Sequence, residues 1–230
     1  MKIGGLQKTS LLDYPDVISA IIWTVGCNFR CPFCYNKDLV FGNKTPISEE
    51  QVLSFLEKRK GLLEALVVTG GEPLMHKDIP DFLEKVKELG YLIKVDTNGS
   101  YPKKLQEIID KKLVNYLDMD VKAPKKKYDK LTGVKTDIKK VDQSIKIIKN
   151  SGIDYEFKTT FVPELLTKED IVEIGKWLKG SKKYYLQQFK NDTNLISMDL
   201  QKFVPYSKKE LTDTLEEIKP YFEKCEIRGT

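Results

Sequence analysis

The chain has 230 residues, of which 40% are hydrophobic, 32% charged and 10% aromatic. This is the composition of a globular protein, and the length allows one α/β domain with a substantial core. The 39 lysine and arginine residues exceed the 34 aspartate and glutamate residues by only 5, a balance that does not indicate nucleic-acid binding. No apolar run is long enough to span a membrane, and the N-terminus lacks the pattern of a secretory signal. We therefore expect a cytoplasmic protein without nucleic-acid or membrane partners.

Short runs of β-branched and aromatic residues alternate along the chain with amphipathic stretches of helical period, which predicts a parallel sheet built from βα units. In chain order, the predicted strands cover residues 17–25, 65–69, 91–96, 114–121, 154–162 and 184–189. The predicted helices cover residues 48–60, 78–89, 102–111, 137–150, 168–178 and 207–222. Because neither a repeat nor a low-complexity linker interrupts this pattern, we predict one domain over residues 1–230, with a cysteine loop at 26–35 and a late loop at 190–206.

Three of the four cysteines, Cys27, Cys31 and Cys34, lie together after the first predicted strand. Clustered cysteines in a chain expected to be cytoplasmic indicate metal binding or catalysis rather than disulfides. Structural zinc sites and ferredoxin clusters normally take four protein ligands, but Cys225 is far along the chain and His76 is the only histidine. Three cysteines therefore suggest an iron-sulfur cluster with one iron left open for a ligand. A zinc knuckle or an electron-transfer site is the alternative.

Glycine-rich or polar segments follow the next three predicted strands. They are Gly70-Gly71-Glu72-Pro73, Asp96-Thr97-Asn98-Gly99 and Asp118-Met119-Asp120-Val121-Lys122. Each alone has an ordinary interpretation, as a tight turn, an Asn-Gly turn or a strand with one polar face. Functional residues of α/β barrels and open sheets gather at the carboxyl ends of the strands, so we expect these segments to meet the cysteine loop.

The C-x3-C-x2-C spacing, with the aromatic Phe33 before the third cysteine, resembles the radical S-adenosylmethionine (SAM) superfamily. The segments after the later strands resemble its glycyl-radical-enzyme activating branch. The N-terminal segment 5–16 is similar to the opening of activating proteins of anaerobic ribonucleoside-triphosphate reductase, although Asp16 stands where glycine is usual and Tyr35 where histidine often follows the third cysteine. The resemblance implies a partial (β/α)6 barrel of parallel strands with outer helices, one 4Fe-4S cluster on the three cysteines, and SAM bound to the open iron.

The same resemblance assigns roles to residues at the strand ends. The backbone of the Gly-Gly-Glu-Pro segment would bind the methionyl amino group, and Lys122 the carboxylate. A monovalent cation would lie among Asp96, Thr97 and Asp120, with a backbone carbonyl from Asp118. Lys158 is either a cofactor contact or an interior lysine, and Gln188 stands where the formate-lyase activating enzymes carry histidine. The full set of cofactor-binding candidates is Phe33, Gly70, Gly71, Glu72, Pro73, Asp96, Thr97, Asp120, Lys122, Lys158 and Gln188.

The activity implied by the resemblance is reductive cleavage of SAM to a 5′-deoxyadenosyl radical, which abstracts a hydrogen from a glycine of a partner enzyme. The expected partner is an anaerobic ribonucleoside-triphosphate reductase or a pyruvate formate-lyase-like enzyme, and the expected electron donor is a flavodoxin or ferredoxin. One alternative is a radical SAM enzyme acting on a small molecule such as a modified-purine precursor. The other is a non-catalytic iron-sulfur or zinc-binding module.

Overall fold

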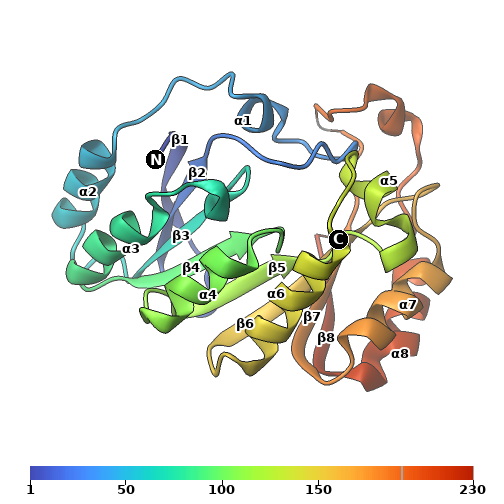
Figure 1. Ribbon diagram of the computed structural model, residues 1–230. Coiled ribbons are helices and arrows are strands. Elements are labelled where there is room, and N and C mark those ends of the chain that lie inside the picture. The colour runs from blue at the N-terminus through green and yellow to red at the C-terminus, as the bar shows by residue number, and fades with distance from the viewer. Residues whose placement is uncertain (193, 230) are drawn as a thin grey trace.

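The computed structural model describes residues 1–192 and 194–229. Within these residues the chain forms one eight-stranded sheet in the order β1 to β8 (Figure 1). Strand β1 runs antiparallel to β2, and every later neighbouring pair is parallel. The strands are β1 (Ile3–Ser10), β2 (Ser19–Thr24), β3 (Ala65–Gly70), β4 (Leu92–Thr97), β5 (Tyr116–Asp120), β6 (Asp154–Phe161), β7 (Ser181–Gln188) and β8 (Phe222–Arg228).

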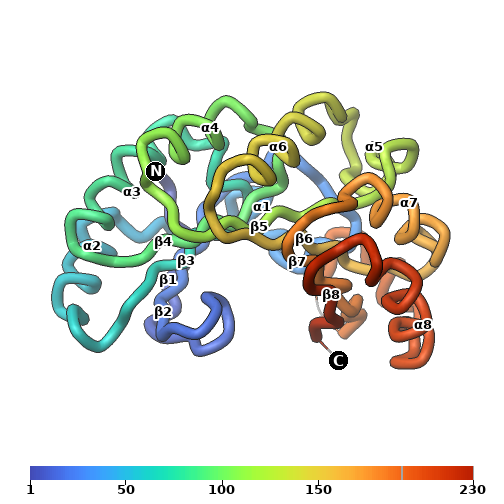
Figure 2. The backbone as a smooth tube through the Cα atoms, turned by 90° about the horizontal axis from the view of Figure 1, so that it is seen from below, coloured from blue at the N-terminus to red at the C-terminus, as the bar shows by residue number. Residues whose placement is uncertain are grey.

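Most of the helices of the described chain lie along one side of this sheet. The helices are α1 (Lys37–Phe41), α2 (Glu49–Lys58), α3 (Ile79–Glu88), α4 (Pro102–Asp110), α5 (Tyr128–Thr132), α6 (Ile138–Asn150), α7 (Lys168–Leu178) and α8 (Lys208–Ile218). Short 3-10 helices are η1 (Pro73–Met75), η2 (Lys125–Lys127), η3 (Met198–Lys202) and η4 (Lys219–Tyr221). Seen from below, the sheet curves into a crescent with the main helices on its convex side (Figure 2). The crescent is open between β1 and β8, the two edge strands of the described sheet.

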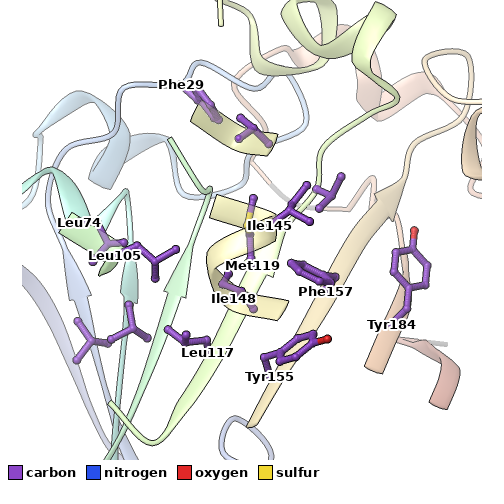
Figure 3. Packing of buried hydrophobic residues seen from close by; sticks show 14 of the residues in the cluster. Phe29, Leu74, Leu105, Leu117, Met119, Ile145, Ile148, Tyr155, Phe157 and Tyr184 are labelled. Atoms are coloured by element: carbon purple, nitrogen blue, oxygen red, sulfur yellow. The ribbon is translucent and has the colours of Figure 1, made fainter. Parts of the chain in front are cut away.

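The main core fills the space between the sheet and the helices. Successive side chains of a strand point to opposite faces, so Leu117 and Met119 of β5 face outward and pack with Phe157 of β6 and Ile148 of α6 (Figure 3). The concave face carries a much smaller apolar cluster around Tyr14 and Tyr116. The rest of that face is available for polar side chains.

The predicted fold class is confirmed, and all six predicted strands are present as β2 to β7. Capping boxes start α2, α7 and α8, with Thr167–Asp170 and Ser207–Glu210 among them. The last predicted helix, 207–222, was too long. Pro220 stands within η4, and the chain enters strand β8 at Phe222.

Strands β1 and β8 were not predicted. Strand β1 contains the pair Gly4-Gly5 and mostly polar residues after it, and such a sequence has little intrinsic preference for a strand. Its pairing with the buried strand β2 supplies the missing stabilisation. The predicted late loop 190–206 includes position 193, which lies outside the described residues; the rest of it is irregular apart from η3. No helix of the described chain combines the length and the apolar character needed to cross a membrane.

Candidate active site

The cysteine loop leaves the carboxyl end of β2 and is fixed by backbone hydrogen bonds to distant segments. The Arg30 N–H donates to the Thr132 carbonyl oxygen at 2.7 Å, and the Ile196 N–H donates to the Cys34 carbonyl oxygen at 3.0 Å. The Arg30 guanidinium also donates to the Cys27 carbonyl oxygen at 2.5 Å. The loop is therefore held in place by its own arginine, by α5 and by the late loop.

All four cysteines belong to the described residues and are free; Cys31 is buried, whereas Cys27 and Cys34 are half-buried. Burial raises the pKa of Cys27 to about 11 and that of Cys31 to about 12, and it also raises the pKa of Cys34. The positive charge of Lys122 opposes this rise at all three thiols. The thiols therefore stay protonated at neutral pH until a metal displaces the protons.

Three free thiols on one rigid loop suit an iron-sulfur cluster, because such clusters are held by cysteine thiolates. Among the described residues, no three His, Cys, Asp or Glu side chains converge on a point that could hold a single metal ion. The assignment of Cys27, Cys31 and Cys34 as cluster ligands stays a prediction.

The Gly-Gly-Glu-Pro turn after β3 lies directly against the start of the cysteine loop. The Glu72 N–H donates to the Gly26 carbonyl oxygen at 2.8 Å, and the Gly71 N–H donates to that of Thr24 at 2.9 Å. A Cβ on Gly71 would lie 1.8 Å from the Gly26 oxygen, and Gly70 has φ +123° with a Cβ position 2.3 Å from the Thr24 nitrogen. These glycines are needed for contact between two backbone segments.

The Glu72 side chain is fully buried and connects the ends of β3 and β4. Its Oε1 accepts hydrogen bonds from Thr97 Oγ1 at 2.7 Å and from the Leu74 N–H at 3.1 Å, and its Oε2 accepts from the Asn98 N–H at 2.7 Å. Burial raises the pKa of Glu72 to about 7, although these donors favour the charged form. Glu72 therefore positions the two strand ends, and its carboxylate contacts protein groups rather than facing solvent.

Asn98 extends this network to the cysteine loop. Its Nδ2 lies 3.8 Å from Cys27 Sγ and 3.0 Å from Asn28 Oδ1. For Asn98 itself the sequence indicated an Asn-Gly turn within a segment that resembles the activating branch, but no contact with a cysteine. The contact with the sulfur depends on how the ends of β2 and β4 are placed relative to each other, which no local sequence signal reports.

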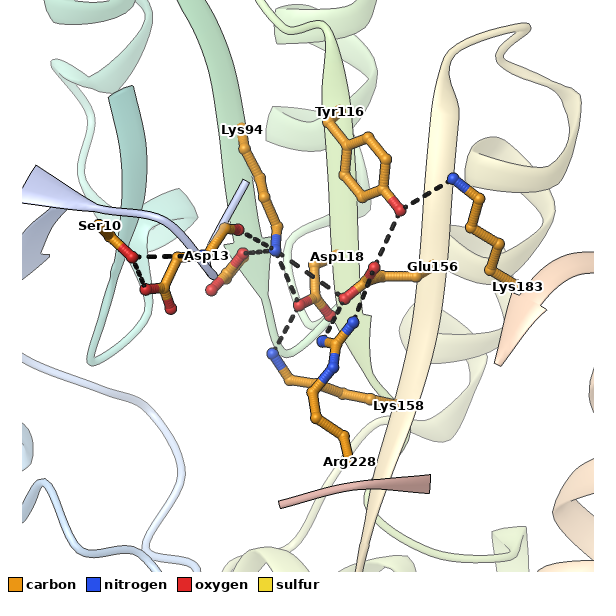
Figure 4. A network of polar contacts seen from close by, with 10 residues as sticks. Ser10, Asp13, Lys94, Tyr116, Asp118, Glu156, Lys158, Lys183 and Arg228 are labelled. Carbon is orange, nitrogen blue, oxygen red and sulfur yellow. Dashed lines mark hydrogen bonds and ion pairs between the residues drawn. The ribbon is translucent and has the colours of Figure 1, made fainter. Parts of the chain in front are cut away.

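A buried network of charged side chains occupies the concave face of β4, β5 and β6 (Figure 4). The Lys94 side chain is 5% exposed, and its Nζ lies 3.4 Å from Asp118 Oδ2, 3.5 Å from Asp96 Oδ1 and 3.9 Å from Glu156 Oε1. Lys158 Nζ donates to Asp118 Oδ2 at 2.7 Å. Lys158 is therefore paired with a buried carboxylate, and both interpretations of it, an interior lysine and a cofactor contact, stay predictions.

Burial and the two lysines act in opposite directions on the pKa values of these carboxylates. Burial works against the charged form of Asp118, but Lys158 and Lys94 outweigh it and hold the pKa of that carboxyl well below its usual range. Burial raises the pKa of Asp96 to about 6, against the opposing effect of Lys94 and Lys158. Burial likewise works against the charge of Lys158, yet Asp118 and Asp120 hold its pKa well above the ordinary value.

Strand β8 completes the network, and sequence reasoning missed its contribution because this strand was not predicted. Arg228 Nη1 and Nη2 donate to Glu156 Oε1 and Oε2 at 2.6 Å and 3.3 Å. The Tyr116 hydroxyl donates to Glu156 Oε2 at 2.9 Å (Figure 4). The fully buried Glu156 carboxylate thus has one partner on β5, Tyr116, and one on β8, Arg228.

Of the four predicted cation ligands, Asp96, Asp118 and Asp120 all act on Lys158 through their charges, whereas Thr97 lies apart from them. The Thr97 hydroxyl is committed to Glu72 and accepts from the Gly99 N–H at 3.1 Å. Thr97 also points to the opposite face of β4 from Asp96, because the two are neighbours on a strand. Asp120 Oδ2 lies 3.2 Å from Lys122 Nζ. The cation stays a prediction.

Lys122 and Gln188, two further candidates, have different surroundings. Lys122 Nζ lies 5.9 Å from the centre of the Phe33 ring, and although burial opposes its charge, Asp120 holds its pKa above the ordinary value. An ammonium group is therefore maintained beside the cysteine loop. Gln188 Nε2 instead donates to the Tyr206 carbonyl oxygen at 2.7 Å, so its amide fastens the late loop to the end of β7.

The model of the Radical SAM superfamily matches residues 21–179. The chain belongs to this superfamily. The match includes the cysteine loop and the ends of β2 to β6, which the geometry brings together. The protein is thus a radical SAM enzyme, and the family implies a 4Fe-4S cluster and SAM as its cofactors.

Individual relatives agree with this assignment. The chain is 32% identical to a protein of Methanocaldococcus jannaschii provisionally named a glycyl-radical enzyme activating enzyme, over 98% of this chain and 95% of the relative. It is 33% identical to 7-carboxy-7-deazaguanine synthase of Thermoplasma acidophilum over 65% of this chain and 69% of that one. The crystal structure of Streptococcus suis SuiB bound to S-adenosylmethionine has a TM-score of 0.64 at 18% identity, covering 91% of this chain and 50% of SuiB. The last likeness concerns the fold alone.

Proposed function

We propose that this radical SAM enzyme is an activase, which removes a hydrogen atom from the Cα of one glycine in a partner protein. The observation that carries the proposal is the similarity to a relative of that name over nearly the whole length of both chains. The shape supports it, since the crescent is open between β1 and β8 (Figure 2). A sheet that does not close leaves a lateral entrance for a loop of another protein.

Three cysteines, one lysine and the backbone of one turn would hold the cofactors. Cys27, Cys31 and Cys34 would bind the 4Fe-4S cluster, which when bound supplies one electron for the cleavage of SAM. Lys122 keeps its charge beside Asp120 and the Phe33 ring. It would orient the methionyl carboxylate, because a compact ammonium group suits an anion. The backbone of Gly70 to Pro73 would bind the amino group at the same end of the sheet.

The partner is proposed on the resemblance of the N-terminal segment 5–16 to activating proteins of anaerobic ribonucleoside-triphosphate reductase. A pyruvate formate-lyase-like enzyme is the other partner of the same chemistry. The cluster needs a low-potential electron, so a flavodoxin or ferredoxin is proposed as the donor, and the enzyme is expected to work without oxygen.

The test is an anaerobic reaction of the cluster-loaded enzyme with SAM, dithionite and a candidate partner from the same organism. We expect 5′-deoxyadenosine in solution and a glycyl-radical doublet in the electron paramagnetic resonance spectrum of the partner. A partner in which the acceptor glycine is replaced by alanine is the control and should give no doublet. Formation of 5′-deoxyadenosine without a radical on any candidate partner would refute the activase proposal while leaving SAM cleavage in place.

A small-molecule substrate is the second candidate, favoured by the 33% identity to 7-carboxy-7-deazaguanine synthase. That similarity covers only 65% of this chain. Mass spectrometry of a reaction with a modified-purine precursor separates the two proposals, since only the second predicts a new small-molecule product. Absence of 5′-deoxyadenosine under all conditions would instead favour a non-catalytic iron-sulfur or zinc-binding module.

A further inference from the structure

Asn98 is a buried polar side chain in contact with a predicted cluster ligand, and the proposed chemistry gives it no role. It follows β4 directly and is 6% exposed. Its Nδ2 lies 3.8 Å from Cys27 Sγ, and the backbone N–H of Phe29 approaches the same sulfur at 3.4 Å. Cys27 therefore receives two N–H donors, one of them from a strand end that is distant in the sequence.

The hydrogen-bond network fixes which end of the Asn98 amide faces the sulfur. The backbone N–H of Ser100 lies 2.9 Å from Asn98 Oδ1, and a backbone N–H can only donate. The oxygen must therefore face Ser100. The NH2 group then faces Cys27 Sγ and Asn28 Oδ1, both of which are acceptors.

The position of this amide is also fixed through the backbone. The Asn98 N–H donates to Glu72 Oε2 at 2.7 Å, and Glu72 is fully buried. The turn after β3, the turn after β4 and the first cysteine are thus joined in one network. An amide held in this way keeps its orientation when the sulfur changes charge.

We propose that Asn98 is a positioning residue that raises the reduction potential of the cluster by donating an N–H to the Cys27 thiolate. Reduction adds negative charge, part of which resides on the sulfur ligands, so a donor at the sulfur stabilises the reduced state more than the oxidised state. Hydrogen bonds to the sulfurs are among the factors that set cluster potentials. The inference rests on the proposed cluster at Cys27.

The simpler interpretation is that Asn98 only forms the turn after β4. Aspartate would serve that purpose equally well, because it keeps an Oδ1 acceptor for the Ser100 N–H and hydroxyl. What aspartate lacks is the NH2 group that faces Cys27 and Asn28. Asn98→Asp therefore keeps the hydrogen bonds of the turn and removes only the N–H donor to the sulfur. Asn98→Ala also removes this donor, but it adds no charge.

The experiment is a potentiometric titration of the reconstituted enzyme, followed by electron paramagnetic resonance of the reduced cluster. For Asn98→Asp we expect about a tenfold lower ratio of reduced to oxidised cluster at a fixed potential, which is about 59 mV for a one-electron couple. Asn98→Ala should shift in the same direction by less. The control Ser100→Ala removes a neighbour of the Asn98 oxygen but not the donor to the sulfur, and its potential should equal that of the wild type.

Each outcome decides the proposal when iron and sulfide contents are measured in parallel. An unchanged potential in Asn98→Asp with a full cluster refutes the role of Asn98 but not the proposed function. Loss of the cluster from both Asn98 variants means that the residue is needed for assembly, and the tuning role is then wrong. A wild-type protein that binds no cluster overturns this inference and the proposed function together.

Discussion

At the scale of single residues, the protons on Cys27 and Cys31 oppose metal binding. Burial raises the pKa of these thiols to about 11 and about 12. The fraction of each thiol present as thiolate therefore keeps increasing until the pH passes its pKa. In the metal-free protein, alkylation of the half-buried Cys27 by iodoacetamide should therefore still accelerate between pH 9 and pH 10, as measured by mass spectrometry. A free cysteine, with its ordinary pKa of about 8.5, should approach its plateau over the same range. A plateau at Cys27 near pH 9 would contradict the prediction.

The three-cysteine assignment predicts different outcomes for two cysteine variants. Cys31→Ala should lose the cluster and all SAM cleavage, because it removes one of three iron ligands. Cys225 lies on β8, outside the cysteine loop, so Cys225→Ala should keep both. Iron content and 5′-deoxyadenosine formation are the measurements. Loss of the cluster in Cys225→Ala would overturn the assignment.

The positions of the cysteines and of the polar strand ends could be predicted from sequence because both follow from local patterns. Their contacts could not. Arg228 and Glu156, for example, are 72 residues apart. Their pairing depends on the register of β8 in the sheet. The contact between Asn98 and Cys27 also depends on the sheet. These residues meet because the carboxyl ends of β2, β3 and β4 lie side by side at one edge of it.

At the scale of elements, the contact between the turn after β3 and the cysteine loop leaves no room for a side chain. Gly71→Ala would place a Cβ 1.8 Å from the Gly26 carbonyl oxygen, so the two backbones must separate. We expect a loss of about 1–3 kcal/mol in the free energy of unfolding, the range typical of overpacking, and a lower iron content after reconstitution. Urea unfolding and iron analysis measure the two effects.

Gly90→Ala is the matched control for Gly71→Ala. Gly90 has φ +91°, and apart from its neighbours along the chain no described residue has an atom within 4 Å of its Cβ position. Its replacement strains the backbone by about 1–2 kcal/mol but should leave the iron content unchanged. Equal iron contents in the two variants would mean that the glycine contact does not position the cysteine loop.

The elements themselves were predictable where the pattern was strong. The six central strands are apolar on at least one face and are followed by amphipathic helices, so periodicity alone located them. Strand β8 alternates charged residues with Cys225 and Ile227 at the edge of the sheet. The predicted helix 207–222 included only Phe222 of this strand, and the rest of it was not predicted, because a short edge segment rich in Glu and Lys carries little strand signal.

At the scale of the whole molecule, the two faces of the crescent have opposite character. The convex face is sealed by helices over an apolar core, whereas the concave face carries the charged network of Figure 4. Lys94 lies at the centre of this network, and its Nζ also donates to the Asp13 carbonyl oxygen at 2.8 Å. It thereby joins the loop between β1 and β2 to the carboxylates of β4, β5 and β6.

Replacing Lys94 by methionine keeps most of the side-chain volume. It removes a positive charge that lies close to three buried carboxylates, those of Asp96, Asp118 and Glu156. We expect a loss of about 3–5 kcal/mol in the free energy of unfolding at pH 8, as is usual when one partner of a buried ion pair is removed. Lys202→Met is the control, because Lys202 is 78% exposed and its Nζ pairs with the exposed Asp199 at 3.0 Å. It should unfold like the wild type.

The loss of stability in Lys94→Met should depend on pH, and the titration of the buried carboxylates sets the direction of this dependence. Burial already raises the pKa of Asp96 to about 6, and removal of Lys94 takes away an influence that lowers it. An acid with a raised pKa in the folded state supports stability below its unfolded pKa and loses that support as the pH rises through the folded value. The variant should therefore lie closer to the wild type at pH 5.5, where Asp96 can stay neutral, than at pH 8. Urea unfolding of both proteins at the two pH values measures this, and an equal loss at both would show that the lysine acts through packing rather than charge.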